Sequence, residues 1–154
     1  MAPKTNTQDI IKETAQDLLH KLNVEASVSV SEAEEGYSLN IQTPESGLLI
    51  GYHGEVINSL QVLLAIIVYK KLKVWVRIIV DVGDYRLKRE ETIKRMALDK
   101  AEEVKRTGQS ATLNSLSPLE RRIVHMTLAK DSDVYSESEG EGNNRRLTIK
   151  PKAQ

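Results

Sequence analysis

The 154-residue sequence contains no cysteine and no phenylalanine, and its only tryptophan is Trp75. Without cysteine, the chain cannot form a disulfide bond, present a thiol nucleophile or bind zinc or an iron–sulfur cluster through sulfur ligands. The sequence therefore excludes a disulfide-rich secreted domain and a cysteine-dependent enzyme. We expect a cytoplasmic protein, because the first residues also lack the basic-then-apolar order of a secretory signal.

Net charge and long apolar runs are also absent. The 22 Lys and Arg residues balance the 22 Asp and Glu residues, so any surface that attracts nucleic acid has to be local. The longest unbroken apolar run, at 62–69, has eight residues, whereas a membrane-spanning helix needs about 20. We therefore expect no membrane insertion. The 40% hydrophobic and 29% charged composition is typical of one globular domain or two small ones.

Hydrophobic periodicity in the first half of the chain predicts a small unit of three helices and three strands. The predicted order is helix, strand, strand, helix, helix, strand, at 6–22, 24–31, 37–41, 43–50, 54–71 and 73–82. The helix at 54–71 is apolar on most of its sides, which predicts that it is the core helix.

The second half begins with a highly charged segment, 84–107, that keeps a narrow apolar stripe at helical spacing and is typical of a connector helix. Residues 109–115 are mostly polar and predict a turn. A final unit follows, with a helix that a Ser117–Glu120 capping box opens and two strands. These three elements are predicted at 117–130, 133–138 and 145–150.

Two glycines, Gly51 and Gly54, stand where the two helices of the first unit meet, preceded by Ile50 and separated by Tyr52 and His53. Glycine has no Cβ, so the chain can turn sharply and let a sugar-phosphate backbone approach the start of the next helix. A tight connection between helices would use the same residues without a ligand. The place of the motif in this order of elements favours a nucleic-acid-binding loop formed by these five residues.

On this motif and element order, residues 8–83 resemble a type II KH domain, whose glycine loop clamps about four nucleotides of single-stranded nucleic acid. The resemblance implies that Gly51 and Gly54 carry the backbone clamp. It also implies an apolar groove under the bases, lined by Leu48, Leu49, Ile50 and Ile57. Relatives often have Lys or Arg at a central position of the loop. Tyr52 and His53 stand there instead, so the electrostatic hold on phosphate is expected to be weaker.

Arg121 and His125 are four residues apart in the last predicted helix. Side chains at this spacing project from one side of a helix, so the pair can address one phosphate. By itself, the spacing fits equally well a solvated helix face with a half-buried histidine. Arg145 and Arg146 would extend a basic track if their strand lies beside this helix.

The sequence around this pair resembles an R-three-H domain, which is named for an Arg and a His with three residues between them. The resemblance covers residues 90–150, and its matching stretches are 120–125, 134–140 and 145–149. Domains of this family bind single-stranded nucleic acid. The resemblance therefore implies that Arg121 and His125 contact the ligand.

A KH domain followed by a charged helix and an R-three-H domain resembles the bacterial Jag family, also called KhpB or SpoIIIJ-associated. The predicted fold is thus α+β, with a KH-like domain at 1–83, a connector at 84–108 that partly belongs to the last unit, and an R-three-H domain at 109–154. Most members carry an additional N-terminal Jag domain, which this resemblance does not include. The family implies binding of single-stranded RNA or DNA, a link to cell elongation and division, and a small single-KH protein as partner.

An enzyme is not expected from this sequence. It contains no P-loop, dinucleotide fingerprint or metal-spaced histidine pair, so we expect no cofactor and no metal site. A hydrolase would have to combine His125 with Ser136 or Ser138 and with Asp131 or Asp133, and no nucleophile elbow supports that combination.

A protein-interaction adaptor is the main alternative to an RNA-binding protein. The neutral net charge and the Tyr52–His53 pair favour an adaptor, with the connector helix or a sheet face around Trp75, Arg77 and Ile79 as the docking surface. RNA contact would then be secondary. Salt dependence of binding separates the two functions.

Overall fold

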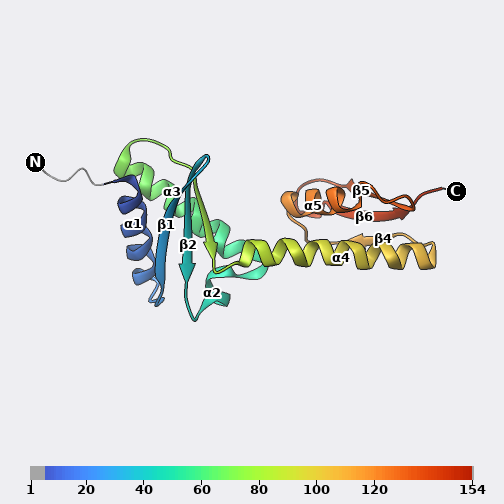
Figure 1. Ribbon diagram of the computed structural model, residues 1–154, viewed down its shortest axis with the longest axis horizontal. Helices are drawn as coiled ribbons and strands as arrows, with labels where there is room; N and C mark the ends of the chain where they lie inside the picture. Colours follow the sequence, from blue (N-terminus) through green and yellow to red (C-terminus); the bar gives the residue numbers. More distant parts are fainter. Residues whose placement is uncertain (1–5, 154) are drawn as a thin grey trace, which may run out of the picture. The chain divides into compact units, whose positions relative to one another are not determined.

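The computed structural model describes residues 6–153, which divide into two compact units between residues 86 and 87 (Figure 1). The first unit contains α1 (Thr7–Lys21), β1 (Ser27–Ala33), β2 (Gly36–Gln42), α2 (Ser46–Ile50), a 3₁₀ turn (Tyr52–Gly54), α3 (Glu55–Leu72) and β3 (Ile78–Val82). Helix α4 (Tyr85–Thr107) begins at the division, and β4 (Ala111–Leu113), α5 (Pro118–Leu128), β5 (Val134–Glu139), a second 3₁₀ turn (Gly142–Asn144) and β6 (Arg146–Pro151) follow. The mixture of helices and strands confirms the predicted α+β class.

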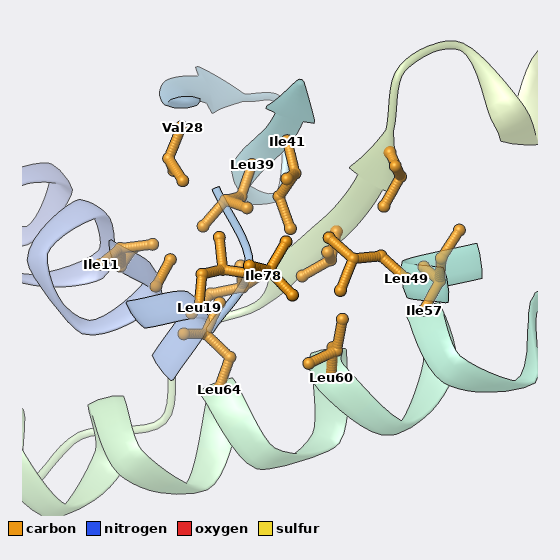
Figure 2. Packing of buried hydrophobic residues seen from close by; sticks show 14 of the residues in the cluster. Ile11, Leu19, Val28, Leu39, Ile41, Leu49, Ile57, Leu60, Leu64 and Ile78 are labelled. Atoms are coloured by element: carbon orange, nitrogen blue, oxygen red, sulfur yellow. The ribbon is translucent and has the colours of Figure 1, made fainter. Parts of the chain in front are cut away.

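The first unit is a three-stranded sheet with helices packed on one face. Strands β1 and β2 form the predicted antiparallel hairpin, and β3 runs parallel to β2 with Ile78 opposite Tyr37. A parallel neighbour requires a crossover, which α2 and α3 supply. Leu39 and Ile41, on alternate positions of β2, pack with residues of α1 and α3 in a single apolar cluster (Figure 2).

Helix α3 contributes to the core of the first unit, as predicted, but it is buried on one face only. The residues that it buries follow helical spacing: Ile57, Leu60, Leu64 and Val68. Val62, Leu63 and Ile66 are exposed to 59%, 49% and 43%, because a helix on a sheet buries one stripe. Residues Ser46–Leu72 are long and apolar enough to cross a membrane by length and composition alone, a property that core helices of soluble proteins share.

Strand β3 begins five residues later than predicted. Lys73 has a left-handed backbone (φ 61°) that ends α3, and Trp75 then stacks on Tyr69 with ring centroids 4.3 Å apart. Pairing with β2 starts only at Ile78. The alternation of apolar residues over 73–82 therefore continues through a connecting segment that is not part of the sheet.

The second unit is an antiparallel sheet in the order β4-β6-β5, packed with α4 and α5. Helix α4 contributes the predicted narrow stripe, Ile93, Ala97, Ala101 and Val104. The prediction of a turn at 109–115 is wrong over Ala111–Leu113, which forms β4 and pairs with β6. A strand of three residues that buries only Leu113 has too short an alternation to be recognised in a polar segment.

The predicted capping box is present at the start of α5, and its glutamate also contacts α4. Ser117 Oγ accepts from the Glu120 backbone N–H, and Glu120 Oε2 accepts from the Ser117 backbone N–H at 2.9 Å. The other Glu120 carboxylate oxygen pairs with Arg89 Nε at 2.7 Å. Glu120 is only 7% exposed, so the Ser117 N–H and the Arg89 side chain share one buried carboxylate.

A second ion pair joins α4 to the start of β5. Lys105 Nζ lies 2.9 Å from Asp131 Oδ2, while Asp131 Oδ1 accepts from the backbone N–H groups of Asp133 and Val134. The Lys105 hydrogen bond, followed by the Asp133 N–H, holds the pKa of Asp131 below its ordinary value. Both oxygens of the Asp131 carboxylate therefore have partners that stabilise the start of β5.

Candidate functional site

The loop from Gly51 to Gly54 turns through backbone conformations that favour glycine. Gly51 has φ 69°, and a Cβ there would lie 2.3 Å from Val56 Cγ2. Gly54 has φ 83°, and a Cβ there would lie 3.0 Å from Cε1 of Tyr85. The two glycines thus have a structural reason as well as the predicted functional one. Ile50, the residue before the loop, is partly buried against the core of the first unit.

Tyr52 and His53 lie between the glycines and stack on each other with ring centroids 3.9 Å apart. Tyr52 is 64% exposed, and His53 has a left-handed backbone with φ 50°. Gly54 stands at the N-cap of α3, where no side chain of the described residues caps the helix. Helix starts leave backbone N–H groups without helical partners. The Glu55 N–H donates to the Tyr52 carbonyl within the 3₁₀ turn, so the loop presents exposed rings at a helix start whose following amide groups have no side-chain cap.

The predicted apolar groove beside this loop is wrong for two of its four residues. Leu49 and Ile57 are 2% and 1% exposed, and Figure 2 shows both side chains pointing into the core cluster. They face the core because α2 and the first turn of α3 pack against the sheet. Leu48 is 62% exposed and lies at the surface.

Two residues that the sequence analysis did not select, Gln61 and Arg86, meet at the outer edge of β3. Gln61 Oε1 accepts from the Val80 backbone N–H at 2.9 Å and from an Arg86 NH2 donor at 3.1 Å. Arg86 Nε donates to the Val80 carbonyl at 2.8 Å. No spacing rule in the sequence connects Arg86 to a glutamine 25 residues earlier.

In the second unit, Arg121 and His125 extend from α5 to different partners. Arg121 donates to the Leu116 carbonyl at 2.7 Å. The two ring nitrogens of His125 face hydroxyl groups on β5, Nδ1 to Ser136 Oγ and Nε2 to Ser138 Oγ. Both side chains are partly buried. Contact of this pair with a phosphate stays a prediction.

The contacts of His125 bear on the hydrolase alternative. A catalytic triad needs a carboxylate behind the histidine that orients the ring and stabilises its charged form. Both ring nitrogens meet serine hydroxyls instead, and Asp131 is engaged by Lys105 and by backbone N–H groups. Among residues 6–153, no group of three or more His, Asp or Glu side chains could hold a metal ion.

Arg145 and Arg146 are exposed near the start of β6, and their side chains make no hydrogen bond or ion pair with another residue of 6–153. The strand that packs against α5 is β5, whereas β6 is the central strand of the sheet. Lys150, also on β6, is different because it pairs with Glu137 at 2.6 Å and Glu139 at 3.1 Å. These two carboxylates raise the pKa of Lys150 and offset its charge.

Comparison with known proteins covers most of the chain. Residues 8–80 match the KH domain of KhpA and KhpB, and residues 91–151 match the R-three-H domain. A protein of Clostridium symbiosum named RNA-binding protein KhpB is 34% identical over 98% of this chain and 69% of its own length. The proteins of that name from Bacillus subtilis and Lactiplantibacillus plantarum are 31% and 35% identical, over 89% and 86% of this chain.

The chain spans 67% of the Bacillus subtilis relative and 41% of the Lactiplantibacillus plantarum relative. The aligned region nevertheless includes both domains of this chain. The predicted resemblance to a KH domain followed by an R-three-H domain is confirmed.

Proposed function

The chain belongs to the KhpB family, and from that premise we propose that it binds single-stranded RNA, with the Gly51–Gly54 loop as its main contact. The observation that carries the proposal is the backbone of this loop. Two glycines with positive φ turn the backbone sharply into the start of α3, where amide groups without a side-chain cap can donate to a phosphate. The relatives named RNA-binding protein KhpB support the same ligand class.

The second unit supplies a further contact in this proposal. Arg145 and Arg146 carry exposed charges that form no ion pair with a described carboxylate, and Arg121 and His125 on α5 are further candidate contacts in the same unit. Single-stranded DNA is a second ligand of the same chemistry. The protein is not an enzyme and needs no cofactor in this proposal, because its site consists of donors and rings without an activated nucleophile.

The cellular role in this proposal is post-transcriptional regulation in the cytoplasm, linked to cell elongation and division. An adaptor that docks a small single-KH protein or a cell-division partner is the alternative function. The exposed apolar residues Val62, Leu63 and Ile66 of α3 favour that alternative, since such a stripe suits a protein contact.

Salt dependence tests the RNA-binding function. We expect the logarithm of the affinity for an unstructured RNA to fall linearly with the logarithm of salt concentration, with a slope of about 0.7 per phosphate contacted. Replacing Arg145 and Arg146 together by Ala is expected to reduce this slope by about 1. Fluorescence anisotropy titrations across a salt series measure both quantities.

The charge-matched control is Lys12→Ala with Lys21→Ala on α1, which removes the same charge from residues outside the site. This variant should keep the wild-type slope. A wild-type protein that binds RNA without salt dependence, or not at all, would contradict the RNA-binding function and favour the adaptor.

A further inference from the structure

The Gln61–Arg86 pair lies on the side of α3 that continues from the glycine loop. Gln61 follows Gly54 by seven positions, which corresponds to two helical turns or about 10 Å along the axis. At about 100° per residue, seven positions bring Gln61 back to nearly the same side of the helix as Gly54. Two consecutive residues at the start of α4 contact the same side of α3. Tyr85 lies against Gly54, and Arg86 donates a hydrogen bond to Gln61. The pair is therefore placed within the reach of a nucleotide strand that is held at the loop.

The hydrogen bonds inside this pair leave only donors unused. Gln61 Oε1 accepts two hydrogen bonds, from Val80 N–H and from Arg86, which occupies both of its lone pairs. The Gln61 Nε2 amide makes no hydrogen bond with residues 6–153. Arg86 uses two of its five N–H donors, one on the Val80 carbonyl and one on Gln61. Both side chains are partly buried, so their orientation is fixed while the remaining donors stay accessible.

Such a surface discriminates between the two purines. Guanine presents two adjacent acceptors, O6 and N7, which suit a pair of donors, whereas adenine places its N6 amino donor beside N7. A donor facing the adenine amino group leaves both groups unsatisfied. Arginine to these two guanine acceptors is the commonest base-specific contact in the recognition of double-stranded DNA, and a single-stranded guanine presents the same two acceptors.

We propose that Gln61 and Arg86 form a base-reading pair that selects guanine over adenine next to the nucleotides held by the glycine loop. The proposal rests on RNA binding as the function of the loop. It assigns base selection to residues that lie outside the loop itself, at the edge of β3. The Val80 backbone serves in it as the fixed support that orients both side chains.

The test uses short oligouridine RNAs in which one guanine or one adenine is moved through every position. At one position, the wild-type protein should bind the guanine RNA about fivefold or more tightly than the adenine RNA, the lower end expected for a paired contact. Replacing that guanine by 7-deazaguanine, which lacks the N7 acceptor, should remove most of this preference. Fluorescence anisotropy gives each dissociation constant.

The Gln61→Glu variant replaces the Nε2 donor by an acceptor oxygen while keeping the shape of the side chain. One carboxylate oxygen still accepts from Val80 and Arg86, and the second is an acceptor where Gln61 has its Nε2 donor. The guanine preference should fall to near onefold or reverse, because an acceptor suits the adenine amino group. Since the added charge weakens all RNA binding, the measured quantity is the ratio of the two dissociation constants.

The matched control is Asn58→Asp, another amide-to-carboxylate change one turn nearer the loop on α3, at an exposed residue that shares no hydrogen bond with the pair among the described residues. It should weaken both RNAs and keep their ratio. Equal affinity of the wild type for both RNAs at every position would overturn the base-reading pair and leave RNA binding intact. The same conclusion would follow if Asn58→Asp changed the ratio of the two dissociation constants as much as Gln61→Glu does. Absence of binding to either RNA would overturn the proposed function itself.

Discussion

Replacing Tyr52 and His53 together by Asp is expected to lower the affinity for single-stranded RNA tenfold or more, about 1.4 kcal/mol. Two carboxylates would then stand where the phosphate approaches, and the exposed ring of Tyr52 would be lost. The fold should tolerate the change. Asp is among the residues that accept a left-handed backbone such as that of His53, and negative charge at a helix start is favourable.

The matched control is the corresponding Asn variant, which removes both rings without adding charge. Its loss of affinity should be smaller, and the difference between the two variants measures electrostatic repulsion alone. Anisotropy titrations give the affinities, and thermal melting verifies that both variants are folded. Wild-type RNA affinity in a folded Asp variant would show that the loop is not the main contact.

The largest expected loss of stability follows from Glu120→Ala in the second unit. This change leaves Arg89, which is 20% exposed, without its partner and removes the acceptor for the Ser117 N–H. We expect the free energy of unfolding of this unit to fall by about 2–4 kcal/mol, since breaking a largely buried ion pair leaves an uncompensated charge and the helix also loses part of its cap. Native-state hydrogen exchange of α5 and β6 amides in urea measures the change.

Glu102→Ala provides the comparison. Glu102 lies on α4 and pairs with Lys105, but its side chain is 74% exposed. Exposed ion pairs contribute about 0–1 kcal/mol, so this variant should be nearly as stable as the wild type. Equal stability of the Glu120 and Glu102 variants would contradict the importance of the buried carboxylate.

The elements that the sequence predicts well are those with a local signal. The Ser117–Glu120 capping box contains both of its partners within one turn, and the hairpin of β1 and β2 follows from alternation on either side of Gly36. The glycine loop was also recognisable, because its two glycines stand between two apolar helical segments. Local rules suffice where the interacting groups are close in sequence.

The features that the sequence did not predict depend on contacts between distant residues. Strand β4 exists because Leu113 pairs opposite Leu147, and neither residue is unusual in its own segment. Gln61 meets Arg86 only after β3 has joined the sheet, and burial of Ile57 depends on the way α3 faces that sheet. The sequence pointed to Ser136 or Ser138 only as a conceivable nucleophile beside His125. In the structure both serines contact this histidine, one at each ring nitrogen.

The side chains at β3 also affect how the first unit behaves at high concentration. The sheet has two outer strands, β1 and β3, and an outer strand with free backbone groups is a template for aggregation with another molecule. Gln61 and Arg86 occupy the outward N–H and C=O of Val80, and the Asp81 carboxylate accepts from the Val82 N–H. A second molecule would have to displace these three side chains before its backbone could pair there. The contacts at β3 therefore favour solubility, and they leave β1 as the strand at which self-association by edge pairing would begin.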